Sequence, residues 1–424
     1  MRLTTALQTF ALAAAVTLAG NASRAATLTI SCGSVGQETK ECQDESNIWA
    51  ARTGNTVKVL GAPQSDTERL ALYQQYLAAG SSDIDIYEID VIWPGVLATH
   101  LADLTGKIDP GVLATHFPSI VANNTVGGKL LALPFFTDAG LLYYRKDLLA
   151  QYGFKPPKTW AELETAAKAV QEKERAAGHG DMQGFVWQGK AYEGLTVDAL
   201  EWVASSQGGT IVGTDGKVTI NNPNAAKALD RAAGWVGTIS PKGVLNYTEE
   251  EGRGVFQSGN AVFMRNWPYA WSLGQSEGSP VKGKIGVSAL PAGEGGTSAA
   301  VLGGWQMAVS KYSKNQDAAI DLVKWLCSQE LQKDRAIRFS QNPTIEALYK
   351  DPDVLKANPF YADLFDVFTH TVARPSRVAG TRYAQLSSAF QATTHEILSS
   401  GGGAAKKLAT LQATLERLSR NGHW

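Results

Sequence analysis

The chain has 424 residues, of which 44% are hydrophobic and 19% are charged, a composition typical of globular proteins rather than disordered or fibrous ones. Its 39 basic and 40 acidic side chains give a formal net charge of −1, so a DNA or RNA partner is not expected. A chain of this length exceeds what one hydrophobic core usually serves, and two globular lobes are predicted.

The first residues have the pattern of a secretory signal. Arg2 supplies a positive start, residues 7–20 are nearly all apolar or small, and residues 23–25 fit a small-x-small cleavage site. We therefore predict that residues 1–25 are a signal peptide and that the mature protein is periplasmic. Cys32 does not stand at the cleavage point, where a lipoprotein would carry its cysteine. No later stretch approaches the ~18 consecutive apolar residues of a membrane span.

Strands and helices alternate from the start of the predicted mature chain, which favours α/β architecture with largely parallel sheets. Asp90 directly follows a β-rich run and is a candidate ligand contact, because ligands of open α/β sheets bind beyond the carboxyl ends of the strands. The expected elements are strand 27–31, helix 38–52, strand 56–60, a helix capped by Ser65 and Glu68 that ends at Gly80, and strand 83–89.

The same alternation continues in the rest of the chain. Residues 141–144 are predicted to form a strand, and Thr159 with Glu162 makes a capping box for the helix that follows. A further helix is expected from residue 222 to 236. The leucines between residues 408 and 418 form one stripe, which predicts an amphipathic helix on the surface of a lobe.

The chain has three cysteines. Cys32 and Cys42 are close in sequence, and an oxidising compartment permits a bridge between them, so a disulfide is predicted against the alternative of two unpaired small hydrophobic residues. Cys327 lies in an apolar run and is expected to be a buried thiol. These spacings and six scattered histidines indicate no zinc or iron site, and no cofactor is expected.

Two sequence motifs resemble parts of catalytic sites. Residues 274–278 match the pattern Gly-x-Ser-x-Gly, but no buried strand precedes Ser276 and Pro280 follows it in place of a helix. Residues 278–284 nearly match a phosphate-binding loop, but Ile285 stands where a hydroxyl would hold magnesium. Both segments are therefore expected to be loops or turns.

Aromatic residues alternate with polar ones in a way that suits sugar recognition, since a pyranose offers C–H faces to aromatic rings and hydroxyl edges to carboxylates and guanidinium groups. The platforms predicted on this chemistry are the 267–271 segment, with Trp267, Tyr269 and Trp271, and the 303–305 segment with its Trp305. Each such residue taken alone is more often a solvated charge or a core aromatic. The predicted edge partners are Glu38, Arg69, Asp90, Asp138 and Arg374.

Several strings of residues, taken in order along the whole mature chain, resemble the family-1 solute-binding proteins of ABC transporters, and within that family the trehalose/maltose-binding branch. The strings are residues 34–38, 85–95, 134–149, 157–160, 256–264, 266–268, 303–305 and 374–375.

The resemblance implies a two-lobed α/β fold of the periplasmic binding protein type (type II), with the ligand cleft between the lobes. One lobe would comprise residues 27–138 plus 303–328, and the other residues 139–302 plus 329–424, with short crossings between them. It also implies a monomeric, non-enzymatic protein that closes around a glucose disaccharide such as trehalose or maltose and delivers it to a membrane permease.

The resemblance further assigns roles to individual residues. Glu38, Arg69 and Asp90 would bind sugar hydroxyls from the first lobe, and Asp138 would do so from a crossing. The remaining contacts would be the stacking ring Trp267, the crossing residues Gly304 and Trp305, and Arg374, with Arg377 as the alternative to Arg374. Family members often have Tyr where this chain has Phe136, and Glu249 or Glu250 could reach the rim of the cleft.

Two alternatives stay open at the level of the sequence. A secreted glycoside hydrolase would also line its cleft with tryptophans and would need two carboxyl groups about 5 to 9.5 Å apart. The second alternative keeps the binding role but changes the ligand to sucrose, an α-galactoside, another oligosaccharide or a polyol.

Overall fold

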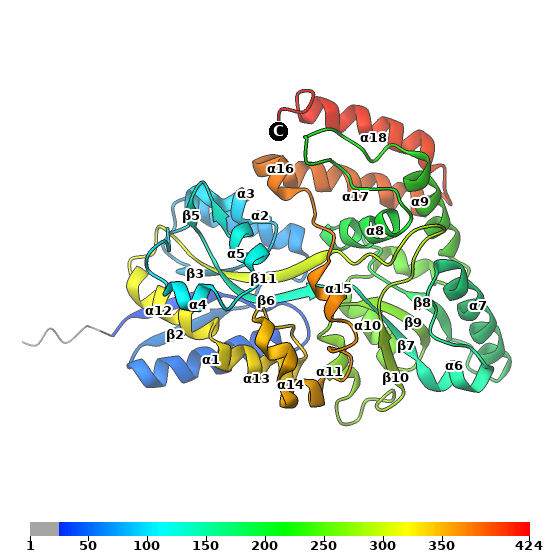
Figure 1. Ribbon diagram of the computed structural model, residues 1–424, viewed down its shortest axis with the longest axis horizontal. Helices are drawn as coiled ribbons and strands as arrows, with labels where there is room; N and C mark the ends of the chain where they lie inside the picture. Colours follow the sequence, from blue (N-terminus) through cyan, green and yellow to red (C-terminus); the bar gives the residue numbers. More distant parts are fainter. Residues whose placement is uncertain (1–24) are drawn as a thin grey trace, which may run out of the picture.

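The computed structural model describes residues 25–424, so the predicted signal peptide lies outside the described residues except for Ala25. Two β-sheets stand side by side with helices packed around each of them. Strands β6 (Leu133–Ala139) and β11 (Leu302–Val309) cross the middle of the molecule between the two groups (Figure 1).

The first sheet carries the amino-terminal strands. Strands β1, β2 and β3 are parallel, whereas β11 runs antiparallel to β3 and to β6. Leu28, Ile30 and Ile86 are fully buried in this sheet, which explains why these short β-branched and leucine-rich runs form central strands. In spatial order the sheet contains β2 (Thr56–Leu60), β1 (Thr27–Ser31), β3 (Ile86–Asp90), β11 and β6.

The second sheet is mostly antiparallel, and only β8 and β9 pair in parallel. The predicted parallel pairing therefore holds for β1, β2 and β3 but not here, because β7 runs in the opposite direction to both of its neighbours, β9 and β10. In spatial order the sheet contains β10 (Ile285–Ser288), β7 (Leu141–Arg145), β9 (Ala261–Asn266) and β8 (Gln183–Val186), and a separate hairpin pairs β4 (Thr125–Val126) with β5 (Lys129–Leu130).

The chain changes sheet over short distances. Strand β6 of the first sheet ends at Ala139, and β7 of the second sheet begins at Leu141, so Gly140 alone separates them. The return runs from the end of β10 at Ser288 to the start of β11 at Leu302. The molecule is thus two packed units joined by brief crossings, as the sequence predicts.

Helices cover both sheets (Figure 1). The longer ones are α1 (Glu38–Thr53), α2 (Asp66–Ala78), α6 (Lys146–Tyr152), α7 (Trp160–Ala176), α8 (Glu193–Ser205), α9 (Pro223–Trp235), α10 (Glu249–Gln257), α12 (Gln316–Leu326), α13 (Gln329–Phe339), α17 (Tyr383–Ser399) and α18 (Ala404–Leu418). The shorter ones are α3 (Pro94–Leu97), α4 (Pro110–Leu113), α5 (Pro118–Asn123), α11 (Ala270–Gly274), α14 (Pro352–Ala357), α15 (Phe365–Thr369) and α16 (Ser376–Ala379), and 3₁₀ turns are η1 (Ala98–His100), η2 (Lys242–Asn246), η3 (Glu346–Lys350) and η4 (Gly380–Arg382).

The predicted helix starts are confirmed by their caps. The Ser65 hydroxyl accepts from the Glu68 N–H, and Thr159 and Glu162 form a reciprocal capping box. Strand β3 begins at Ile86, three residues later than predicted, because the Asp85 carboxylate accepts from the Thr29 N–H. The last helix, α18, packs on α17 and α9 and buries Leu408, as the leucine stripe predicts.

The cysteines have the predicted states. Cys32 and Cys42 form a disulfide with their Cα atoms 6.4 Å apart, which ties α1 to the end of β1. Cys327 is free and buried, and burial raises the pKa of its thiol to about 12, so the thiolate that would react is scarcely populated at neutral pH.

The catalytic-looking motifs are turns, as expected. The Ser276 hydroxyl donates to the Leu273 carbonyl just after α11, and residues 278–284 form turns. Among residues 25–424, no group of three or more His, Cys, Asp or Glu is arranged to hold a metal ion. Within the same residues, no helix has both the length and the apolar character needed to cross a bilayer.

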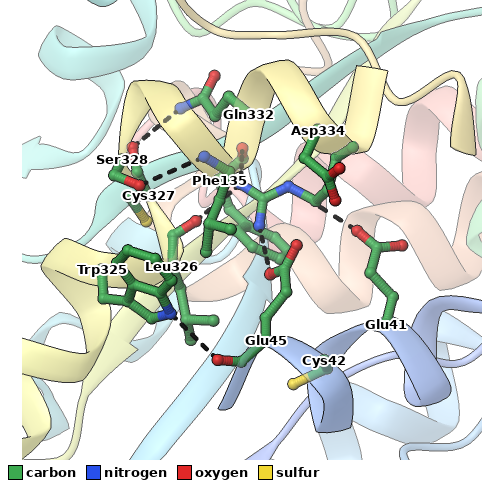
Figure 2. A network of polar contacts seen from close by, with 12 residues as sticks. Glu41, Cys42, Glu45, Phe135, Trp325, Leu326, Cys327, Ser328, Gln332 and Asp334 are labelled. Carbon is green, nitrogen blue, oxygen red and sulfur yellow. Dashed lines mark hydrogen bonds and ion pairs between the residues drawn. The ribbon is translucent and has the colours of Figure 1, made fainter. Parts of the chain in front are cut away.

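A buried ion network fastens α1 to α13. The Arg335 guanidinium on α13 donates to Glu45 at 2.8 Å and to the Leu326 carbonyl at 2.7 Å, and it lies 3.8 Å from Glu41. Figure 2 shows Glu41 and Glu45 reaching from α1 toward α13. Two buried carboxylates thus share one arginine, and desolvation raises the pKa of Glu45 to about 7 although Arg335 opposes the rise.

This network predicts how stability depends on pH. Because the folded-state pKa of Glu45 lies above its unfolded value, its contribution to stability is present below about pH 4.5 and is lost as the pH rises through about 7. We expect Glu45→Gln to be more stable than the parent at pH 8 by on the order of 2 kcal/mol, with little difference at pH 4.5. Urea unfolding at the two pH values measures this.

The control is Glu330→Gln, which removes an exposed carboxyl from the same helix-helix region. It should leave the pH dependence of the parent unchanged. If Glu45→Gln also kept the parent's pH dependence, Glu45 would not be the titrating group.

Candidate functional site

A pocket lies between the two sheets, where the carboxyl end of β3, the end of β9 and the start of β11 meet. The space inside it that no atoms fill, including a part that is open to solvent, is about 540 Å³. Its lining residues are Ser34, Val35, Glu38, Gln64, Asp66, Asp90, Asp138, Gly194, Val197, Glu249, Trp267, Tyr269, Gly303, Gly304, Trp305 and Arg374.

Asp90 and Arg374 form a charged pair in the lining of the pocket. Asp90 is the last residue of β3, and its carboxylate accepts from Arg374 at 2.7 and 3.2 Å. The same guanidinium donates to Glu193 at 3.0 Å, and Glu193 in turn accepts from Tyr383 and Ser387. All three charged side chains are buried, so Arg374 joins the strand end in the first sheet to α8 and α17 beside the second.

Glu38 enters the pocket from the first turn of α1. Its Oε2 atom accepts from the backbone N–H groups of Ser34 and Val35. Desolvation, followed by the nearby Glu88 carboxylate, raises the pKa of Glu38 to about 7, against the lowering effect of these two N–H groups. The side chain can therefore accept a hydroxyl proton or, when protonated, donate one.

Trp305 is held at the start of β11. It pairs across the sheet with Asp90 and Phe136, and the Arg69 guanidinium lies over its ring at 4.1 Å. Gly304 precedes it with a φ of +107°, and a Cβ there would meet the Phe136 carbonyl oxygen at 2.5 Å. Only glycine fits that position, because both the backbone conformation and the close approach to β6 exclude a side chain.

Trp267 faces the pocket from the end of β9. Its indole N–H lies 3.4 Å from a Glu249 carboxylate oxygen, and its backbone N–H donates to Asn266. The ring packs against Gly303, where a Cβ would meet it at 2.9 Å. Trp267 is thus fixed at its edge and backbone and presents a ring to the space between the sheets.

Asp138 and Glu249 add acceptors to the pocket. Asp138 lies at the end of β6, and desolvation with the nearby Glu38 raises its pKa well above the usual range. Desolvation also raises the pKa of Glu249. Carboxylates around two indole rings form a site suited to a neutral ligand rich in hydroxyl groups.

The structure brings together seven of the eight predicted site residues: Glu38, Asp90, Asp138, Trp267, Gly304, Trp305 and Arg374 all line the pocket. Arg69 does not line it. It is fully buried, donates to Glu88 at 2.8 Å and to Tyr73 at 3.1 Å, and lies behind Trp305. Arg377 is exposed and lines a separate cavity.

Among the other lining residues, Asp66 was not predicted. It opens α2, where an acidic residue is also favoured simply by the helix dipole, so its role is not visible in the sequence. Tyr269 belongs to the predicted 267–271 platform and lines the pocket, whereas Trp271 of the same segment does not line it. Phe136 packs against Phe135 at 5.3 Å between ring centroids and is not in the lining.

Comparison with known proteins agrees with this geometry. The family model described as bacterial extracellular solute-binding protein matches residues 37–333. A relative from Deinococcus radiodurans, named probable ABC transporter-binding protein, is 53% identical over 405 residues, which are 95% of this chain and 96% of the relative. The chain belongs to the bacterial extracellular solute-binding protein family.

Solved structures of the family confirm the predicted two-lobed type II fold. The structure described as maltose-bound T. maritima MalE3 aligns with a TM-score of 0.88 and 41% identity over 93% of this chain and 100% of that one. An Agrobacterium vitis ABC transporter solute-binding protein with bound D-mannitol aligns with a TM-score of 0.80 over 93% of this chain, and at 22% identity it shows the fold alone. The binding protein is therefore a solute receptor of the ABC transport type, and the glycoside hydrolase alternative is wrong.

Proposed function

We propose that this binding protein takes up a glucose disaccharide, maltose or trehalose, in the pocket between its lobes and delivers it to the permease of an ABC importer. The observation that carries the proposal is the meeting of Trp267 and Trp305 with the Asp90–Arg374 pair in one pocket. Indole rings pack on the C–H faces of sugars, and carboxylate and guanidinium groups form hydrogen bonds with the hydroxyl groups at the sugar edges. The maltose bound to the 41% identical relative supports the same ligand class.

The proposed site residues keep the roles assigned from sequence, with one refinement. Glu38, Asp90, Asp138 and Arg374 bind hydroxyl groups, Trp267 stacks, and the Gly304–Trp305 segment closes the site. Arg69 supports Trp305 from behind and does not bind the ligand directly, because its guanidinium already pairs with the Glu88 carboxylate and stacks on the Trp305 ring.

Ligand binding would shift the protein toward a closed state, because both lobes contribute contacts to the ligand only when they are closed around it. We propose that one lobe comprises residues 27–138 plus 303–328 and that the other comprises residues 139–302 plus 329–424. Arg335 of α13, in the second lobe, then bonds to Glu45 of α1, in the first. The protein would act as a monomer in the periplasm after removal of residues 1–25.

Calorimetric titration of the mature protein tests the ligand class. Maltose and trehalose should each bind saturably, and glucose and mannitol should bind at least about 10-fold more weakly, because they fill fewer of the opposed ring and carboxylate contacts. Mannitol is a necessary comparison, since a mannitol-binding protein of Pseudomonas aeruginosa is 26% identical over 57% of this chain. Tighter binding of mannitol than of either disaccharide would overturn the proposal.

A further inference from the structure

The ring of Trp267 has a buried cation on one side. The Arg265 guanidinium lies 4.0 Å from the ring centroid, within the range of a cation–π contact. Arg265 is the residue before last of β9 and Trp267 follows the strand, so the two side chains, two positions apart, share one face of the strand. Arg265 is 1% exposed, whereas Trp267 reaches the pocket.

Arg265 is itself fixed by side chains of α8. It donates to both carboxylate oxygens of Glu201, at 2.9 and 2.6 Å, and lies 3.0 Å from Asp198. Gln188 accepts a further hydrogen bond at 3.2 Å. Such a fork of bonds holds a planar guanidinium in one orientation, so the surface on which the indole ring lies is rigid.

The same cluster touches both short crossings between the sheets. The Glu201 carboxylate accepts from the Val301 N–H at 3.2 Å, just before β11. At the other crossing, a side chain on Gly140 would overlap the Glu201 carboxylate and the Arg265 guanidinium. The cluster therefore lies between the pocket ring and the two segments about which the lobes are joined.

Stability alone is a poor explanation for such a cluster, because a buried ion pair is on average no more stabilising than a well-packed apolar group of the same volume. Its geometry instead suits one task, which is to hold a ring at a fixed angle and position relative to the crossings. A sugar bound on that ring meets a platform that is ordered before binding, which lowers the entropic cost of binding.

We propose that Arg265, held by Glu201 and Asp198, is a positioning residue that sets the plane of Trp267 for ligand stacking. The inference rests on the proposed sugar-binding function. Arg265 does not touch the ligand; it acts through the ring.

A double-mutant cycle tests this coupling. Arg265→Lys keeps the charge but loses the planar fork and the stacked face. We expect it to weaken maltose binding about 10-fold in the parent and less than about 2-fold in the Trp267→Ala background, where no ring remains to be positioned. Equal losses in the two backgrounds, or no loss in the parent, would overturn the proposal.

Arg145→Lys is the matched control, since Arg145 is a buried arginine of the adjacent strand β7 that pairs through a similar fork with Asp147. It should leave maltose affinity unchanged, and a loss as large as that of Arg265→Lys would also overturn the proposal. If Arg265→Lys does not fold, Glu201→Gln, which loosens the same fork, takes its place in the cycle.

A second readout needs no sugar. The near-ultraviolet circular dichroism of Trp267, obtained by subtracting the spectrum of Trp267→Phe, should change in Arg265→Lys and persist in Arg145→Lys. If the parent binds none of the sugars, the proposed function fails, and this spectrum alone decides the positioning role: an altered Trp267 signal supports it, and an unaltered signal overturns it.

Discussion

Replacement of Trp267 by alanine is expected to weaken maltose binding about 100-fold, measured by calorimetric titration. The ring is the stacking platform on the side of the second sheet, and its loss removes both apolar contact area and a specific aromatic face. The fold should survive, because Trp267 is only partly buried and its backbone lies beyond the end of β9.

Trp271→Ala is the matched control for that prediction. Trp271 lies four residues further on, donates its indole N–H to the Ala357 carbonyl and packs on Phe360, outside the pocket lining. It should lose stability and retain affinity. Comparable affinity losses in the two variants would show that Trp267 does not act as the ligand platform.

Replacement of Arg374 by methionine is expected to lower the free energy of unfolding by about 3 kcal/mol at pH 8, because Asp90 and Glu193 then remain buried without their cation. The loss should be smaller at pH 5. Burial already raises the pKa of Glu193 while Arg374 lowers it, so without the arginine this carboxyl can protonate as the pH falls. Urea unfolding at both pH values measures the difference.

Arg377→Met on the same segment provides the comparison. Because Arg377 is exposed, this substitution should lower the free energy of unfolding by less than about 0.5 kcal/mol. Adding Glu193→Gln to Arg374→Met should recover part of the lost stability by removing one of the two uncompensated charges. A loss in Arg374→Met that neither pH nor Glu193→Gln alters would indicate a packing defect in place of the electrostatic one.

Much of the fold could be predicted from local patterns. Strand β1, strand β2 and helix α1 follow from short apolar runs, turn residues and a helix start, and the Thr159 capping box fixes the start of α7. Asp90 could be placed at a strand end because a strand and its carboxyl end are both local features. The antiparallel pairing of the second sheet could not be predicted, since it depends on which lobe each strand joins.

The same difference between local patterns and long-range contacts applies to the site residues. Residues that carry the sugar-recognition pattern, such as Trp267 and Trp305, could be predicted from side-chain chemistry and segment order. The buried partners could not: Arg265 finds Glu201 64 residues away, and Arg374 finds Glu193 181 residues away. A charge in an otherwise apolar strand, such as Arg265 after Met264, does signal a buried partner, but it does not name it.

The location of the ligand is tested most directly by a crystal structure of the mature protein grown with saturating maltose. We predict sugar density between the lobes, with one ring packed on Trp267 and hydroxyl groups within hydrogen-bond distance of Asp90, Asp138 and Arg374. Maltose bound elsewhere on the protein, or an empty pocket at a maltose concentration that saturates the titration, would contradict the assignment of this site.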